Sequence, residues 1–177
     1  FIQVQSLLYI KKTTKLPDSL IKELEEVSRR DTQYTFQIEE FDHLEDNQKD
    51  ISLLYSLRVQ RNQEAASTLY SWIKDQKADQ RPDVIITPNG SILEMGAIYQ
   101  TARHLNIPAT TYEFGEQRQR IWFSQNEEVM LQNTTEMWQH RQNHSLNSQQ
   151  WVQIKSLYAS RQNASLWKNF ARLWQEQ

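Results

Sequence analysis

The chain of 177 residues contains only three glycines, and where they lie constrains the fold more than any other feature. All three fall between Asp83 and Gly115, and three of the four prolines lie in or beside the same segment. Glycine permits positive φ and close approach of backbone, and proline fixes φ. Tight turns between strands and helices need such residues in any α/β domain, so the clustering has a structural explanation beside a functional one.

This segment carries the pattern of a strand, a turn, a helix and a second strand. Three adjacent β-branched apolar residues in Asp83–Thr87 predict a strand buried on both faces, as in parallel sheets. Pro88–Ser91 turns the chain, and Ile92–Leu105 is helical. Asn106 is expected to stop that helix in the left-handed conformation, before a strand at Pro108–Glu113. A crossover this short predicts two parallel strands connected with right-handed topology.

The flanking sequence predicts further elements of an α/β domain. We expect strands at Phe1–Ile10, Tyr34–Ile38 and Ile121–Phe123, a helix opening at Pro17, a long helix at Ile51–Lys77, and helices from Asn126 onward, the last of them with Leu166, Phe170, Leu173 and Trp174 as its apolar stripe. Together they predict a single Rossmann-like domain over residues 1–177, with three layers, a mainly parallel sheet and extra C-terminal helices.

Composition and missing motifs exclude several classes of function. The chain has no Cys, so disulfides and thiolate metal sites are excluded. The net charge of −2 gives no overall attraction to nucleic acid. The sequence lacks the GxxxxGK[ST], GxGxxG, HExxH and GxSxG motifs, and its four His residues lack metal-ligand spacing. We therefore expect no metal and no cofactor.

The candidate site lies beyond the carboxyl ends of the two expected parallel strands. Ligands of open α/β sheets bind at that edge. Asn89, Gly90 and Ser91 follow the first strand and begin a helix, whose N-terminus favours anions. Glu113 and Gly115 follow or end the second strand. We therefore expect both loops to open on one rim.

Three charged residues complete the set of candidates, each with a plainer alternative. Glu113 can act as a base or hold a sugar hydroxyl, or it can bond to loop backbone. Glu94, in the first helical turn, can contact a ligand or simply offset the helix dipole. Arg118 can meet a phosphate or remain solvated, and together with Arg120 and Trp122 it leaves nucleic-acid binding as a further hypothesis.

The run from Pro82 to Glu116 resembles the amino-terminal domain of bacterial two-domain glycosyltransferases of the GT-B type, which build capsular and surface polysaccharides. It shares with them a buried strand ending in Asn89-Gly90, a helix, the step Asn106-Ile107-Pro108, and a strand leading into Thr111-x-Glu113-x-Gly115. Asn106 stands where the family usually has Gly, and Asn tolerates the left-handed conformation.

The resemblance implies an acceptor-side domain of a cytoplasmic hexosyltransferase, associated peripherally with the inner face of the membrane. Such an enzyme moves a sugar from a nucleotide-sugar to a glycan or lipid-linked acceptor, and its carboxyl-terminal domain holds most of the donor. Because the chain begins at Phe1 without an initiator Met, we expect it to be part of a longer protein. The resemblance implies that this part is inactive alone, because the donor-binding carboxyl-terminal domain is not in it. A non-catalytic module that binds a small anionic ligand or a protein partner remains the alternative.

Overall fold

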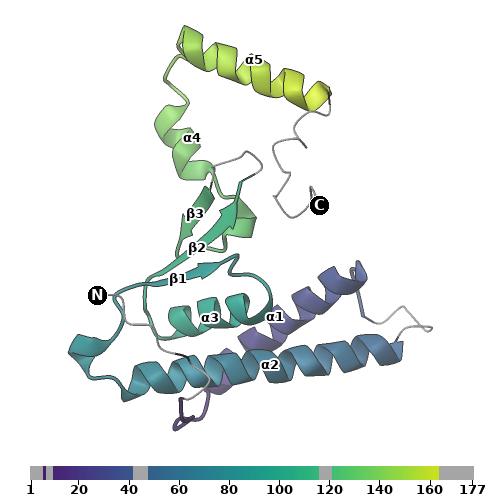
Figure 1. Cartoon of the computed structure of the whole chain (residues 1–177), viewed down its shortest axis with the longest axis vertical. Coiled ribbons are helices and arrows are strands. Elements are labelled where there is room, and N and C mark those ends of the chain that lie inside the picture. The colour runs from purple at the N-terminus through teal and green to yellow at the C-terminus, as the bar shows by residue number, and fades with distance from the viewer. Residues whose placement is uncertain (1–5, 7–9, 42–47, 116–120, 164–177) are drawn as a thin grey trace. The chain divides into compact units, whose positions relative to one another are not determined.

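The computed structural model describes residues 6, 10–41, 48–115 and 121–163 (Figure 1). The chain divides into two compact units, one within residues 1–112 and 123–131 and the other within residues 113–122 and 132–177. The helix expected around Leu166–Trp174 lies outside the described residues, as does the strand expected at Phe1–Ile10 apart from Ser6 and Ile10, which have no regular structure.

The first unit contains three helices and most of a three-stranded sheet. Its elements are α1 (Asp18–Phe36), α2 (Gln48–Asp75), a 3-10 turn η2 (Ala78–Gln80), β1 (Ile85–Pro88), α3 (Leu93–His104), β2 (Ala109–Phe114), β3 (Ile121–Gln125) and a second 3-10 turn η3 (Val129–Leu131). The division between the units falls near the ends of β2 and β3. The predicted helices of this unit and the strand around Ile121 are confirmed.

The core of the first unit lies where α1, α2 and α3 meet. Leu20, Leu24 and Val27 of α1 are fully buried and lie on one side of this helix. Leu20 and Leu24 pack in a cluster that includes Tyr70 of α2 and Ala97 of α3. These three helices lie on one side of the sheet (Figure 1). The core therefore fixes α3, the helix that follows the candidate turn.

The strand predicted at Tyr34–Ile38 is wrong, because α1 continues to Phe36. The polar residues between these apolar positions suggested alternation, but Tyr34 is 75% exposed and takes no part in a sheet. The helix ends at Gln37, which adopts the left-handed conformation at φ 54°. The Gln37 and Ile38 N–H groups donate to carbonyls of the last turn, the bond pattern of a Schellman motif.

The sheet is mixed rather than wholly parallel. Strand β1 pairs with β2 in parallel, from Ile85 opposite Ala109 to Pro88 opposite Tyr112, as predicted. Strand β3 lies on the other side of β2, and Asn126 at its end donates its N–H to the Ala109 carbonyl, so the two strands form an antiparallel hairpin. The α/β class is confirmed, and a Rossmann-like, mainly parallel sheet stays a prediction.

The expected burial of β1 on both faces is wrong. Ile86 is 63% exposed, whereas Thr87, whose side chain points to the opposite face, is buried. Among the described helices, only α3 packs against β1, and it covers one face. A run of β-branched residues therefore indicated the strand correctly but not the number of layers around it.

A polar cluster is buried between α1 and α2. Asn62 of α2 donates to the Ser28 hydroxyl of α1 over 2.9 Å, and its own Oδ1 atom is buried without a hydrogen-bond partner. Arg58 Nε lies 2.7 Å from Asp31 Oδ2, which makes an ion pair, although the two groups lack the alignment of a hydrogen bond. Burial raises the pKa of Asp31, and the Arg58 guanidinium opposes that rise.

The second unit contains the described helices α4 (Thr135–Arg141) and α5 (Ser148–Gln162). Asn147 and Gln150 begin α5 with a capping box, in which each side chain accepts from the other residue's N–H over 2.9 Å. None of the described side chains of this unit is buried. No helix in the described ranges has the length and apolar character needed to cross a membrane.

The raised pKa of Asp31 predicts that the free energy of unfolding depends on pH. Because its folded-state pKa lies above the ordinary 3.8, ionising it disfavours the folded state, so this residue makes stability fall as pH rises from 3.8 through the raised pKa. We expect Asp31→Asn to remove this part of the pH dependence when the free energy of unfolding in urea is measured across the acidic range. Asp79→Asn, on the exposed turn η2, should leave the pH dependence unchanged. Parallel profiles for the parent and Asp31→Asn would contradict this account.

Candidate functional site

The turn predicted after β1 is confirmed, and its backbone enters the left-handed region. Asn89 has φ 56° and Gly90 has φ 82°. The Asn89 side chain accepts from the Ser91 N–H over 3.0 Å, and the Asn89 N–H donates to the Tyr112 carbonyl over 2.7 Å. The turn is therefore closed by its own side chain and attached to the end of β2.

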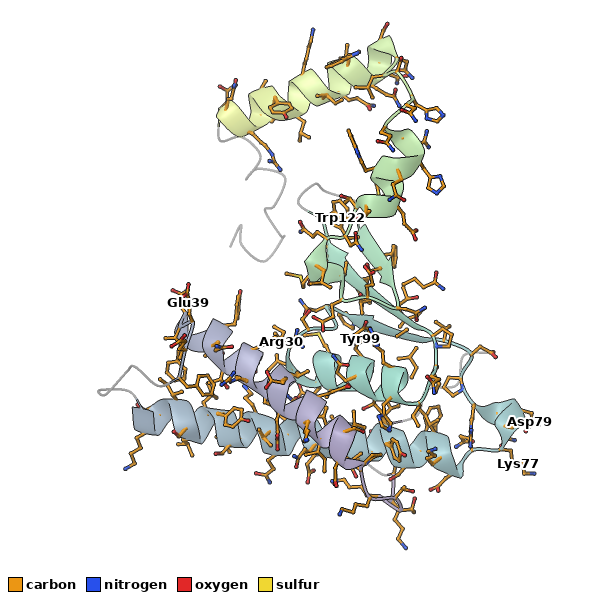
Figure 2. All side chains as sticks on the ribbon, turned by 180° about the vertical axis from the view of Figure 1, so that it is seen from behind. Arg30, Glu39, Lys77, Asp79, Tyr99 and Trp122 are labelled. Carbon is orange, nitrogen blue, oxygen red and sulfur yellow. The ribbon has the colours of Figure 1, made fainter. Side chains whose placement is uncertain are left out.

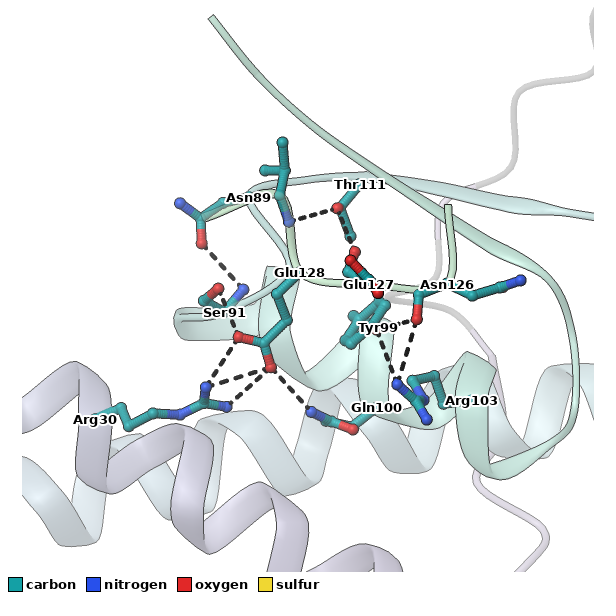
Figure 3. Close-up of polar contacts among 11 residues, drawn as sticks. Arg30, Asn89, Ser91, Tyr99, Gln100, Arg103, Thr111, Asn126, Glu127 and Glu128 are labelled. Atoms are coloured by element: carbon teal, nitrogen blue, oxygen red, sulfur yellow. Dashed lines mark hydrogen bonds and ion pairs between the residues drawn. The ribbon is translucent and has the colours of Figure 1, made fainter. Parts of the chain in front are cut away.

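Gly90 is pressed against Thr111 in the middle of β2. A Cβ atom at Gly90 would lie 2.4 Å from the Thr111 methyl carbon, so this position has no room for a side chain. The buried Thr111 hydroxyl donates to the Glu127 carbonyl over 2.7 Å and accepts from the Val129 N–H over 2.8 Å. Thr111 thus holds the chain after β3 alongside the turn, as Figure 3 shows.

Glu128 connects that chain to three other parts of the first unit (Figure 3). Its carboxylate accepts from the Ser91 hydroxyl over 2.8 Å and from the Arg30 guanidinium of α1 at 2.9 and 3.3 Å. A longer contact of 3.5 Å joins it to the Gln100 amide of α3. The Glu128 side chain is only 14% exposed, so these partners account for most of its surroundings.

A second set of hydrogen bonds fixes the end of β3 against α3. The buried Tyr99 hydroxyl donates to the Asn126 carbonyl over 2.9 Å, and the Asn126 side chain accepts from the Ala109 N–H. Arg103 donates to both the Tyr99 hydroxyl and the Asn126 carbonyl. The hydrogen bond to Tyr99 is the main reason that the pKa of Arg103 is raised.

Carboxylates of the chain itself occupy the N-terminal end of α3. Glu94 lies in its first turn and pairs with Arg61 of α2, and Glu128 accepts from the Ser91 hydroxyl just before the helix. Negative side chains at a helix N-terminus offset its dipole. An anionic ligand at Ser91 would meet two carboxylates, so the arrangement favours a neutral ligand with hydroxyl groups.

The remaining predicted residues belong to other parts of the chain. Glu113 and Gly115 are in the second unit, where the Glu113 carboxylate accepts from the Phe114 N–H over 3.0 Å. Phe114 is the last residue of β2, so this bond goes to backbone at the end of the strand and not to the loop expected. Arg118 lies outside the described residues. The structure therefore brings Asn89, Gly90 and Ser91 together and describes Glu113 and Gly115 separately.

Sequence reasoning missed Glu128 and Arg30. These residues lie 98 positions apart, and Arg30 carries no local signal beyond an exposed place on a helix. A weak signal exists for Glu128, because Asn126-Glu127-Glu128 interrupts an apolar strand just before the buried Val129. Polar residues beside a buried position often have a partner inside the fold.

An open cleft of about 470 Å³ lies between α1 and α3 in the same unit. It is lined by Lys22, Glu23, Glu26, Arg30, Gln100, Arg103 and His104. The mixture of both charge signs gives it no clear preference for cations or anions. Within the described part of the chain, no three His, Asp or Glu side chains come together to hold a metal ion.

Comparisons with models of protein families, with curated proteins and with solved structures found no match for this chain.

The contact between Gly90 and Thr111 predicts a large effect of adding one methyl group. We expect Gly90→Ala to lower the free energy of unfolding by about 2–4 kcal/mol, from the clash and from the positive φ together. The double variant Gly90→Ala with Thr111→Ser removes the clashing methyl carbon and should recover about half of that loss in urea unfolding. Thr111→Ser alone is the control. Equal losses of unfolding free energy in Gly90→Ala and in the double variant would show that the clash with Thr111 does not contribute.

Because two carboxylates lie near the N-terminus of α3, we predict that this turn does not bind inorganic phosphate. We expect inorganic phosphate to leave the Gly90 and Ser91 amide signals unshifted in NMR titrations of the parent protein. In the Glu94→Gln and Glu128→Gln variants the local negative charge falls and Arg61 or Arg30 loses its partner, so phosphate should shift these signals. Glu39→Gln, just beyond the C-terminal end of α1 in Figure 2, makes the same charge change elsewhere, and phosphate should leave the signals of that variant unshifted. Phosphate binding by the parent would contradict this prediction.

Proposed function

We propose that this chain is the amino-terminal, acceptor-side domain of a glycosyltransferase that moves a sugar from a nucleotide-sugar to a glycan or lipid-linked acceptor. The observation that supports it most is the hydrogen-bonded Asn89–Ser91 turn at the carboxyl end of β1, where Pro88 pairs with Tyr112 of β2. In open α/β sheets this edge is where ligands bind. The resemblance of Pro82–Glu116 to GT-B enzymes suggests the reaction.

The hydrogen bonds of Ser91 support a hydroxyl-bearing ligand. A carboxylate can only accept, so the Ser91 hydroxyl proton points to Glu128 and its oxygen is left to accept from a ligand. Sugar hydroxyl groups are donors of this kind. The acceptor glycan fits this turn better than the diphosphate of the donor, which a carboxyl-terminal Rossmann-like domain would hold.

Glu113 is the proposed base for the reaction. As the acceptor oxygen attacks the anomeric carbon, its proton passes to the carboxylate and the bond to the nucleoside diphosphate breaks. The Phe114 N–H bonded to Glu113 would help to orient that carboxylate. Gly115 and Arg118 would complete the loop beyond β2, and association with the inner face of the membrane would bring a lipid-linked acceptor within reach.

The alternative is a non-catalytic module that binds a small anion or a protein. The carboxylates at Glu94 and Glu128 weigh against an anion at the α3 N-terminus. A gene that continues beyond Gln177 into a second Rossmann-like domain would favour the enzyme, and one that ends near Gln177 would favour the module.

The test uses the full-length protein that contains this chain. We expect release of a nucleoside diphosphate from one of a panel of UDP-, GDP- and dTDP-sugars, accelerated by glycan acceptors. Glu113→Gln should lower kcat by about 10²–10⁴-fold, the usual contribution of a general base, with a smaller change in KM. Glu39→Gln serves as the control. Unchanged kcat in Glu113→Gln removes Glu113 from the mechanism, and no release from any donor refutes the proposal.

A further inference from the structure

One face of the sheet in the first unit carries apolar side chains that no described helix of that unit covers. These helices lie on the other side of the sheet, where α3 packs against β1 (Figure 1). On the uncovered face, Ile86 of β1 is 63% exposed, and Val84 just before the strand is exposed too. Pro88 lies on the same face, because side chains two residues apart in a strand point the same way. The first unit therefore has an apolar surface that is separate from its core.

Two aromatic rings extend this face across the neighbouring strands. Tyr112 of β2 is the register partner of Pro88. The centroid of its ring lies 6.3 Å from that of Phe123 on β3, with 46° between the ring planes. Phe123 is 65% exposed, and Tyr112 is half-buried. One proline ring and two aromatic rings thus lie on one face of three adjacent strands.

The described residues of this face carry no charge. Strand alternation adds only Thr110 of β2 and Gln125 of β3 to the apolar positions. Nucleic acids and anionic membranes are bound through cationic side chains, so neither suits this face. A sugar chain suits it poorly as well, since hydroxyl groups placed over Ile86 would lose their hydrogen bonds to water. The face favours an uncharged ligand with apolar rings.

The size of the face limits the partner further. Three strands about 4.8 Å apart, each contributing roughly four residues at about 3.3 Å, present roughly 200 Å². A stable interface between two folded proteins buries about 800 Å² on each partner. An extended peptide segment needs less surface. A polyproline II segment is already ordered before it binds, so little conformational entropy is lost when a small surface holds it.

We propose that this face binds a proline-rich segment of another protein in the polyproline II conformation. The C–H groups of the proline rings stack on the faces of the Tyr112 and Phe123 rings, which carry partial negative charge. A polyproline II backbone makes no internal hydrogen bonds, so its carbonyls can accept from the exposed Gln125 amide. Aromatic-lined surfaces recognise such segments in other proteins. This binding does not depend on the proposed glycosyltransferase reaction.

The test is an NMR titration of the whole chain with decaproline, and with a glycine–serine decapeptide for comparison. We expect only decaproline to shift the amide signals of Ile86, Tyr112 and Phe123. Phe123→Ala should weaken binding at least about tenfold because a stacking ring is lost, whereas Phe123→Tyr keeps the ring and should change the affinity less than about twofold. Tyr34→Ala removes a similarly exposed ring from α1 and should leave the affinity unchanged. Since both side chains are exposed, the signals of the buried core should stay the same in all variants.

Several outcomes would overturn the proposal. One is the absence of any shift in these signals at saturating decaproline concentrations. Another is an equal loss of affinity in Phe123→Ala and in Tyr34→Ala. Shifts of the same signals by the neutral oligosaccharide cellopentaose, without shifts by decaproline, would assign the face to a glycan. Self-association that Phe123→Ala abolishes, without decaproline binding, would assign it to a second copy of the chain.

Discussion

The contact between Gly90 and Thr111 is the constraint on which the candidate site depends. Because Gly90 has no side chain, the turn after β1 closes directly onto β2, and the Thr111 hydroxyl is left to bind the chain after β3 on both sides of Glu128. That attachment brings Glu128 to Ser91 and Arg30. A larger residue at position 90 would separate the turn from the strand, and the carboxylate would lose its place beside α3.

The electrostatics of the turn follow from this placement. A free helix N-terminus attracts anions, and an Asn-Gly-Ser turn before a helix ordinarily suggests a phosphate site. Here Glu94 and Glu128 already offset the α3 dipole, and each is paired with an arginine from another helix. The backbone geometry of an anion site is therefore present, but the surrounding side chains decide the charge at the α3 N-terminus. Two of these side chains come from residues distant in sequence, and together they disfavour an anion.

Local features of this fold were predictable from the sequence, and features set by distant partners were not. The turn at Asn89, the left-handed Asn106 and the parallel pairing of β1 with β2 follow from neighbouring residues, and the structure confirms them. The strand predicted at Tyr34–Ile38 is wrong because α1 continues to Phe36 and ends only at the left-handed Gln37. The exposure of Ile86 could not be predicted, since it depends on which elements cover the sheet. Glu128 escaped notice because its partners come from α1 and α3.

The two units differ in how they treat their aromatic residues, and the difference bears on how the chain works. Tyr99 and Tyr70 of the first unit are buried and hold α3 in its core. Trp138, Trp151 and Tyr158 of the second unit are exposed, in a stretch without acidic residues. Exposing such rings is unfavourable in water and favourable at a lipid interface. The first unit therefore folds around a buried core, whereas the second unit presents its aromatic rings at its own surface.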